Sequence, residues 1–329
     1  MRLPNLRPLG PGLLFLWTVL AAPARADLVL TSAGSDAGFT LTPFITGFPS
    51  TGYCCGPLGA ATNSDGVVMV VSYAENSINL YNNLNGQVAS QSIGSAPFYD
   101  QNYGAALAYT NGHVYASYSQ NLAVVELNND GTIASTVGTG IGKGGLWTNP
   151  VNGHLLSAYY GAIYDIDPLT DTWRLVVNAD VDGVSVSNDG QTVYGAAYGH
   201  VYGWNIASGA LTFDSGYIGS PDGTAVIEGS SPLSGNIVAN GNDGNVWLIN
   251  PQTAALTLIA SGGSRGDYVG LDHTNGSLFV SQTDSLYRLT CGADCFFTAP
   301  NVPEPSTLGL TLAAGLGLAA FGMYRRRRT

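Results

Sequence analysis

Charged side chains are scarce in this sequence. Only 10% of the 329 residues are Asp, Glu, Lys or Arg. Between residues 27 and 301 there are 21 acidic and only four basic residues, a net charge of about −17 with neutral histidines. A surface of this sign repels phosphate groups, which argues against nucleic acid and anionic lipid as partners.

Two common cofactor signals are also missing. The chain has four histidines, no H-x-x-x-H spacing and no cysteine next to a histidine, so we predict no transition-metal site. Residues 140–145 match the letters of a phosphate-binding G-x-G-x-x-G loop. However, residues 146–150 cannot start the helix that such a loop requires, and we interpret the match as a loop between repeats.

Glycine, tyrosine and apolar residues are plentiful instead. The sequence has 44 glycines, 18 tyrosines and 45% hydrophobic residues, a composition typical of turn-rich β structure. Its central part, roughly 275 residues, is long enough for one large core or two small ones.

Residues 1–26 have the three parts of a secretory signal peptide. Arg2 and Arg7 form a basic start, residues 13–22 are apolar, and residues 24–26 place small side chains beside a cleavage point before Asp27. Prolines limit the apolar run, so it is too short to span a bilayer. We predict that this segment is removed on export.

A second apolar segment lies near the C-terminus. Residues 306–324 contain no acidic or basic side chain and reach about 28 Å as a helix, which matches one hydrocarbon core. A basic tail follows at residues 325–329, and Lys and Arg prefer the cytoplasmic side. The sequence thus predicts one transmembrane helix that anchors an ectodomain, residues 27–300, outside the cytoplasm.

A short proline-rich linker, residues 301–305, precedes this helix and contains Pro303, Glu304 and Pro305. The order of Pro-Glu-Pro triplet, apolar helix and basic terminus resembles the PEP-CTERM sorting signal of Gram-negative bacteria that make exopolysaccharide. The basic residues of the signal are Arg325, Arg326, Arg327 and Arg328. The resemblance covers residues 302–329. It implies that an exosortase, a membrane-embedded cysteine protease, recognises the triplet and processes the chain nearby, so that the ectodomain reaches the cell surface or the medium.

One pattern recurs six times between the two ends: an aliphatic residue, a usually aromatic one, any residue, an apolar one, then Asn or Asp. The copies begin 38 to 46 residues apart. This spacing is close to the ~40 to 50 residues of a four-stranded propeller blade. The copies are residues 78–82, 124–128, 163–167, 201–205, 246–250 and 286–290, of which only the last lacks the final Asn or Asp.

Six such units cannot each bury a core alone, but a ring of them shares its faces and leaves few free edges. We therefore predict an all-β fold, a six-bladed β-propeller. A pair of β-sandwiches and a β-solenoid are the alternatives, although solenoid repeats are usually shorter. Residues 39–45 have no place in the first blade, and we predict that they close the ring as the outer strand of the last blade.

Polar residues stand before the first strand of five blades. They are Asn102, Lys143, Asp182, Asp222 and Asp267. Loops at this position converge on one mouth of a propeller channel, where oxygen atoms can hold Ca²⁺ or a sugar, and some six-bladed lactonases hold a metal there. Acidic residues are also ordinary at the entry to a strand, so a structural role is the competing interpretation.

Other conspicuous side chains are better explained by the repeat itself. His113 and His154 fall at the same place in successive repeats, which indicates a turn position and not a ligand set. Trp204 and Trp247 lie inside the repeated strand, so we expect them to fill space between blades, although aromatic faces also stack on sugars.

The four cysteines form two clusters, and an exported protein tends to oxidise them. In a propeller, Cys291 follows the third strand of the last blade and lies on the face opposite to Cys54 and Cys55. Because a disulfide needs Cα atoms within about 7 Å, we predict a local bond between Cys291 and Cys295. Cys54 and Cys55 then form a strained vicinal disulfide or stay free. A cross-link between the clusters is the alternative.

These features predict an exported, non-enzymatic propeller that binds an exopolysaccharide or a matrix protein, with a role in biofilm. The alternative is a propeller hydrolase or lactonase that uses the channel carboxylates. A structural matrix component without a ligand is the third possibility, and no catalytic residue stands out.

Overall fold

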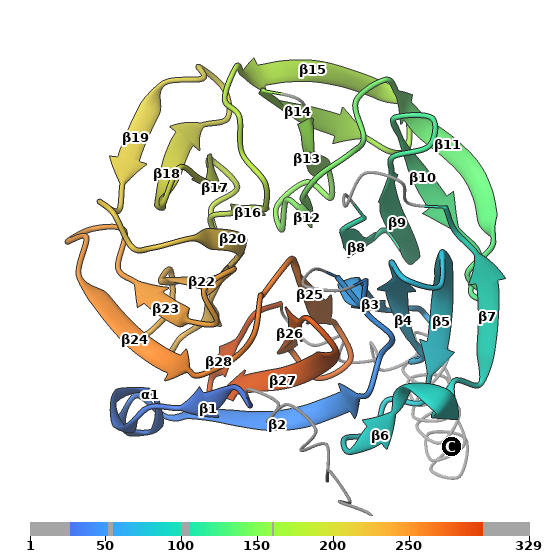
Figure 1. The fold of residues 1–329 in the computed structure, drawn as a ribbon. Coiled ribbons are helices and arrows are strands. Elements are labelled where there is room, and N and C mark those ends of the chain that lie inside the picture. The colour runs from blue at the N-terminus through green and yellow to red at the C-terminus, as the bar shows by residue number, and fades with distance from the viewer. Residues whose placement is uncertain (1–26, 52–54, 100–104, 160, 299–329) are drawn as a thin grey trace, which may run out of the picture.

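The computed structural model describes residues 27–51, 55–99, 105–159 and 161–298, which form a ring of six antiparallel β-sheets (Figure 1). Four sheets have four strands and two have five, and a separate two-stranded ribbon completes the fold. The predicted six-bladed β-propeller is therefore confirmed. The sandwich and solenoid alternatives are wrong.

The first three blades each take four strands from one stretch of chain, and in blade 1 the strand β6 interrupts this stretch because it belongs to blade 6. Blade 1 consists of β3 (Pro57–Thr62), β4 (Val68–Ser72), β5 (Ser77–Tyr81) and β7 (Gly94–Pro97). Blade 2 consists of β8 (Leu107–Thr110), β9 (His113–Tyr118), β10 (Ala123–Leu127) and β11 (Ile133–Thr139). Blade 3 consists of β12 (Leu146–Thr148), β13 (Leu155–Tyr159), β14 (Ala162–Asp167) and β15 (Thr172–Val177).

Blades 4 to 6 continue the ring. Blade 4 consists of β16 (Val184–Val186), β17 (Thr192–Ala197), β18 (His200–Asn205) and β19 (Leu211–Asp214). Blade 5 consists of β20 (Pro221–Val226), β22 (Ile237–Gly241), β23 (Val246–Ile249), β24 (Leu256–Ser261) and, at its outer edge, β1 (Val29–Leu30). Blade 6 consists of β25 (Val269–Asp272), β26 (Ser277–Gln282), β27 (Ser285–Cys291), β2 (Phe39–Thr46) and β6 (Gln87–Val88).

The repeated sequence pattern corresponds to the third strand of each blade, and its final Asn or Asp shapes the next turn. In blade 4, Oδ1 of Asn205 accepts hydrogen bonds from the backbone N–H groups of Ala207 and Ser208. Asn250 makes the equivalent bonds in blade 5. Blade 6 needs no such turn, because its fourth strand does not come next in the chain. This explains why the sixth copy lacks the Asn or Asp.

The N-terminal part of the domain closes the ring. Strand β2 runs antiparallel to β27, from the pair Phe39–Cys291 to the pair Thr46–Ser285, with an irregularity after Pro43. The predicted closure is confirmed. The structure adds two contacts that the sequence did not suggest: β1 pairs with β24 of blade 5, and β6 pairs in parallel with β2. Between β1 and β2 lies the short helix α1 (Ser32–Asp36), so one segment spans the outer edges of two blades.

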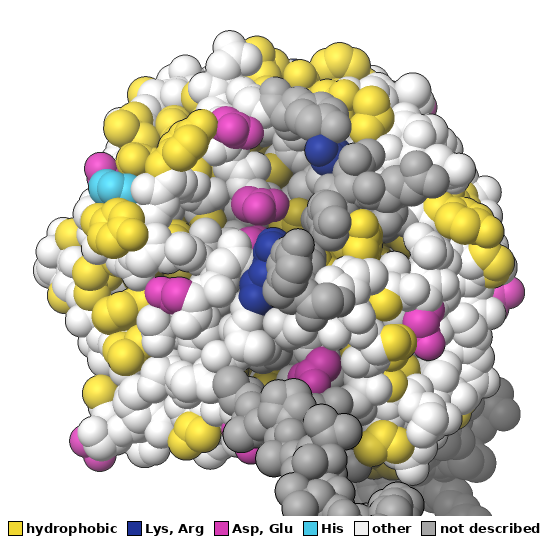
Figure 2. Space-filling view, in the orientation of Figure 1, with side chains coloured by type: hydrophobic (Ala, Val, Ile, Leu, Met, Phe, Trp, Pro, Cys, Tyr) yellow, Lys and Arg dark blue, Asp and Glu magenta, His cyan; other side chains and the backbone are white. Residues whose placement is uncertain are grey.

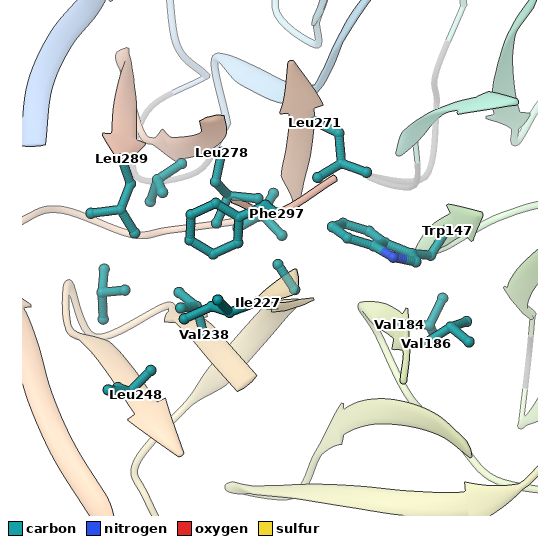
Figure 3. Close-up of a cluster of buried hydrophobic side chains, with 14 of the residues drawn as sticks. Trp147, Val184, Val186, Ile227, Val238, Leu248, Leu271, Leu278, Leu289 and Phe297 are labelled. Carbon is teal, nitrogen blue, oxygen red and sulfur yellow. The ribbon is translucent and has the colours of Figure 1, made fainter. Parts of the chain in front are cut away.

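The end of the domain folds back against one face of the ring. After β27, the strand β28 (Cys295–Phe296) pairs with β21 (Glu228–Gly229), which follows the innermost strand of blade 5. Phe297 is 1% exposed and lies with Leu278 and Ile227 in the largest buried cluster (Figure 3). Its backbone N–H donates to the carbonyl oxygen of Gly276. We call this side, which carries residues 291–297, the tail face.

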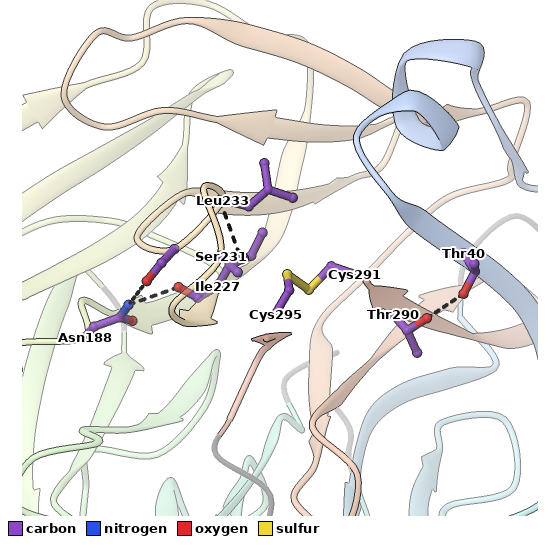
Figure 4. The surroundings of a disulfide bond; sticks show 9 residues. Thr40, Asn188, Ile227, Ser231, Leu233, Thr290, Cys291 and Cys295 are labelled. Carbon is purple, nitrogen blue, oxygen red and sulfur yellow. Dashed lines mark hydrogen bonds between the residues drawn. A yellow bond between two sulfur atoms is a disulfide. The ribbon is translucent and has the colours of Figure 1, made fainter. Parts of the chain in front are cut away.

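The predicted Cys291–Cys295 disulfide is confirmed and holds this turn, with Cα atoms 5.3 Å apart (Figure 4). Cys55 is also disulfide-bonded, which excludes the free thiol for this residue. Cys54 lies outside the described residues.

Both predicted targeting signals also fall outside the described residues. These are residues 1–26 and the region from 299 onward, including the linker, the apolar segment and the basic tail. Within the part of the chain that the structure covers, no helix has the length and apolar character needed to cross a membrane.

Candidate ligand site at the channel mouth

Glycines directly before the innermost strands of blades 3 and 4 help to bring the predicted carboxylates together. The backbone N–H of Gly183 donates to the carbonyl oxygen of Asp222 over 3.0 Å, and Gly145 donates to that of Asp182 over 2.8 Å. A Cβ on Gly183 would lie only 2.3 Å from the Asp222 oxygen, so only glycine permits this approach. Neighbouring blades are thus joined backbone to backbone at the residues that carry the carboxylates. We call this side the mouth face.

A hydrogen-bonded cluster occupies the centre of the mouth face. The hydroxyl of Tyr268 donates to Oδ1 of Asp182 over 2.9 Å, and Nδ2 of Asn242 donates to Oδ2 of Asp222 over 2.9 Å. The guanidinium of Arg265 lies between two carboxylates, 3.9 Å from Oδ2 of Asp222 and 3.5 Å from Oδ2 of Asp267. Asp222 and Asp267 are buried, whereas Asp182 reaches solvent.

The environment disfavours negative charge on these groups. Desolvation raises the pKa of Asp222 well above its ordinary value, and the nearby carboxylates of Asp182 and Asp267 raise it further, against a smaller opposing effect of Asn242 and Arg265. Desolvation also raises the pKa of Asp182, although the hydrogen bond from Tyr268 opposes this. The pKa of Tyr268 is raised well above its usual range, first by burial and then by the adjacent carboxylates.

Two oxygen atoms of the cluster have no hydrogen-bond partner among the described residues. They are Oδ1 of Asp222 and Oδ1 of Asn242, and both are buried. A buried acceptor without a donor costs about 1–3 kcal/mol. A proton on the carboxyl group of Asp222 would supply a hydrogen-bond donor near these two oxygens. The raised pKa of Asp222 also favours the protonated form.

A cavity of about 370 Å³ opens above the cluster. Charged residues on its wall include Lys143, Asp180, Asp182 and Arg265. Tyr159, Tyr198 and Tyr268 also line it. Figure 2 shows basic and acidic side chains next to one another at the centre of this face. Volumes of roughly 300–1,000 Å³ are usual for small-molecule sites.

The sequence prediction identified only part of this arrangement. Lys143 and Asp182 line the cavity, whereas Asp222 and Asp267 lie beneath it, and Asn102 is outside the described residues. Tyr198, Arg265 and Tyr268 were missed. Of these, Tyr268 directly follows Asp267, and Tyr198 precedes a glycine in a tight turn, so the repeat pattern contained a signal for two of the three.

The cluster does not fit a calcium site, because the guanidinium of Arg265 already lies where a cation would neutralise Asp222 and Asp267. Among the described residues, no group of three or more His, Cys, Asp or Glu side chains is arranged to hold a metal ion. The proposal of a bound Ca²⁺ stays a prediction, which a calcium titration followed by thermal unfolding tests.

The other sequence interpretations concern structural residues. The loop of residues 140–145 connects β11 to β12, as predicted. His113 and His154 make equivalent pairs with third-strand carboxylates, Nδ1 lying 2.9 Å from Glu126 and from Asp165 respectively. Trp204 belongs to the largest core cluster, and Trp247 packs against another.

The C-terminal region was compared with known protein families. Residues 301–328 match the model of the PEP-CTERM protein-sorting motif. The chain carries a PEP-CTERM sorting signal. This signal implies export, membrane-associated sorting and processing by an exosortase. No curated protein matches the sequence of this PEP-CTERM propeller.

Solved structures show what the propeller resembles. A gluconolactonase from Xanthomonas campestris is 16% identical, with a TM-score of 0.56 over 84% of this chain and 99% of that one. A luciferin-regenerating enzyme is 12% identical, with a TM-score of 0.56 over 80% and 98%. A streptogramin B lyase is 14% identical, with a TM-score of 0.51 over 80% and 100%. At these identities the likeness shows the fold of the PEP-CTERM propeller and not its activity.

Proposed function

We propose that this PEP-CTERM propeller is an exported binding protein that holds part of an exopolysaccharide in the cavity of the mouth face. The proposal rests on the residues that line this cavity. Lys143, Asp182 and Arg265 offer charged hydrogen-bonding groups for sugar hydroxyls, and Tyr159 and Tyr198 offer aromatic rings beside them. Few convergent polar groups on a partly apolar wall are typical of ligand sites.

The sorting signal supports the location of this activity. We propose that the apolar segment, residues 306–324, anchors the chain until exosortase removes it, and that the propeller then acts at the cell surface or in a biofilm matrix. Intact-mass measurement on protein from an exosortase-bearing host should show a mature chain without residues 306–329. A surface form that still contains them contradicts the processing step.

A glycan array with the purified protein tests the binding proposal, and calorimetry should follow with any saccharide that binds. Asp182→Asn and Lys143→Met remove charges from the cavity wall, and each should weaken binding at least about tenfold, since hydrogen bonds to charged groups contribute about 1.5–3 kcal/mol. Asp36→Asn, an exposed change on α1, is the matched control and should leave affinity unchanged. An array without any bound saccharide refutes the proposal.

One observation favours a second candidate, a propeller hydrolase or lactonase. Carboxylates with strongly raised pKa values gather at catalytic sites, and Asp222 lies beside Asp182 and Arg265 under an open cavity. The fold-level likeness to a gluconolactonase points the same way. Lactone hydrolysis measured by pH-stat separates the candidates. Turnover that Asp222→Asn abolishes favours the enzyme, whereas saccharide binding without turnover favours the binding protein.

A further inference from the structure

A second cavity, of about 290 Å³, adjoins the channel mouth on blade 4. Asp180, Val181, Ala197 and Tyr198 line both cavities, so the two cavities adjoin at these residues. The outer cavity adds Tyr202, Trp204 and Leu211 of blade 4. It also adds Asn178 and Ala179, which follow β15 of blade 3.

Tyr198 stands where the cavities meet and has an unusual conformation. Its φ of 51° lies in the left-handed region, and Gly199 after it has a φ of 85°. Two positive φ angles in a two-residue hairpin favour Asn-Gly, and a tyrosine there is strained by about 1–2 kcal/mol. The side chain is 78% exposed, so core packing does not explain it, and its hydroxyl donates to Oδ2 of Asp180 over 3.1 Å. Strain held at an exposed aromatic residue points to a function.

Further aromatic rings continue from Tyr198 along blade 4. The ring of His200 stacks on Tyr202, with centroids 5.3 Å apart and an interplanar angle of 3°, and Trp204 lies 5.7 Å beyond Tyr202. Tyr217 is 73% exposed and meets His200 edge to face. Of these rings, Tyr198 and Tyr202 line the outer cavity, and flat rings placed in this way suit the C–H faces of successive sugar units.

We call the second cavity the aromatic groove. The charges around it indicate which class of polysaccharide it can bind. Asp180 lines the groove, Asp214 pairs with His200 at 2.7 Å, and the groove lining contains no Lys or Arg. Carboxylates accept hydrogen bonds from sugar hydroxyls but repel uronic acids and sulfates. The groove therefore suits an uncharged chain.

We propose that a neutral polysaccharide binds across both cavities, one end in the channel mouth and the following units on the aromatic groove of blade 4. This inference rests on the proposed saccharide binding at the mouth and adds the class and the path of the ligand. Tyr198 contacts the chain at the junction, and Tyr202 contacts the units beyond it.

Calorimetry with neutral hexose oligosaccharides, from disaccharide to octasaccharide, and with their uronic acid counterparts tests the inference. Affinity should rise at least tenfold with length in the neutral series. Tyr202→Ser should return the affinity for long chains to that for short ones and leave short-chain binding unchanged. Tyr198→Asn should weaken long-chain binding about tenfold while it raises the unfolding temperature, because it relieves the strained turn; this excludes misfolding as the cause. Trp173→Ser, an exposed aromatic on blade 3, is the control.

The outcomes separate this inference from the proposed function. If short saccharides bind but affinity does not rise with length, or Tyr202→Ser leaves long chains unaffected, the groove is not part of the site. A preference for uronic acids overturns the neutral ligand, and Tyr202-dependent capture of apolar peptides overturns the polysaccharide. If no saccharide of any length binds, the binding proposal itself fails.

Discussion

The mouth face and the tail face are the two ends of the same inner strands, yet they contain opposite chemistry. The mouth face gathers Asp182, Asp222 and Asp267 near one guanidinium, and two of its buried oxygens have no hydrogen-bond partner within the described ranges of the chain. The tail face buries Phe297 among aliphatic side chains and is fixed by a disulfide. The tail face also carries the ribbon of β21 and β28 and the disulfide turn, so packing closes this face, whereas the mouth face keeps a polar cluster under a cavity.

The largest expected effect comes from a change that breaks both faces together. Deletion of residues 27–48 removes β1 and β2, and with them the outer strands of blades 5 and 6. Blade 6 then exposes β27, and the ring loses its closure. We expect no cooperative transition in thermal or urea unfolding followed by circular dichroism.

A shorter deletion is the control for this experiment. Removal of residues 27–31 takes away β1 alone, and it should lower the midpoint while the transition stays cooperative. If the longer deletion unfolds with an unchanged midpoint, the ring does not depend on its N-terminal strand.

Phe297→Ala should affect stability without affecting the mouth face. The side chain is fully buried beside Leu278 and Ile227, and removal of a buried phenylalanine costs about 3–5 kcal/mol. Urea unfolding measures this loss, and Leu169→Ala, at a residue 74% exposed, should change stability by less than about 0.5 kcal/mol. A Phe297→Ala protein that keeps wild-type stability but loses saccharide binding would reverse the roles assigned to the two faces.

Replacement of Cys291 and Cys295 by serine should have a smaller effect on the same face. The bond closes a loop of only a few residues and lowers the entropy of the unfolded chain. For a loop of this size, its removal should lower the free energy of unfolding by about 2 kcal/mol. Reductant should lower the urea midpoint of the wild type at least as much as the double substitution does, because it also reduces the disulfide of Cys55. Peptide mapping without reduction should recover the Cys291–Cys295 link, and a peptide that joins either residue to Cys55 would contradict this pairing.

Asp222→Asn should increase stability, in contrast to the changes on the tail face. Desolvation raises the pKa of Asp222 on folding, so the folded state binds its proton more tightly than the unfolded chain. That contribution to stability is fully present below the unfolded pKa of about 4 and disappears as pH rises through the folded pKa. The variant cannot ionise there, so near pH 8 it should exceed the wild type by on the order of 1 kcal/mol.

Unfolding from low to high pH measures this effect. The advantage of Asp222→Asn should vanish near pH 4, where the wild-type carboxyl is protonated in both states. Asp36→Asn should show no such dependence, because Asp36 is exposed on α1. A variant less stable than the wild type at every pH would mean that the charged carboxylate holds the cluster together.

The sequence predicted the parts of this molecule that repeat. Six copies of one strand pattern were enough for the blade count, and a leftover segment, residues 39–45, was enough for the closure. Acidic residues at equivalent positions indicated the mouth. Arg265 could not be found in this way, because its ion pair with Asp222 exists only in the folded protein. Tyr198 precedes a glycine in a tight turn, but nothing in the sequence placed that turn at the cavity. Strand β1 was missed because two residues carry no detectable period.

The disulfide turn and Phe297 also determine on which face of the ring the described chain ends. The described chain leaves the ring at residue 298, on the tail face, and the sorting motif begins at residue 301. The described chain therefore ends on the side of the ring opposite to the mouth face. The seven residues of β27 span about 23 Å at ~3.3 Å per residue, which is roughly the thickness of the disc. The cavity on the mouth face thus opens about one strand length away from the end of the described chain.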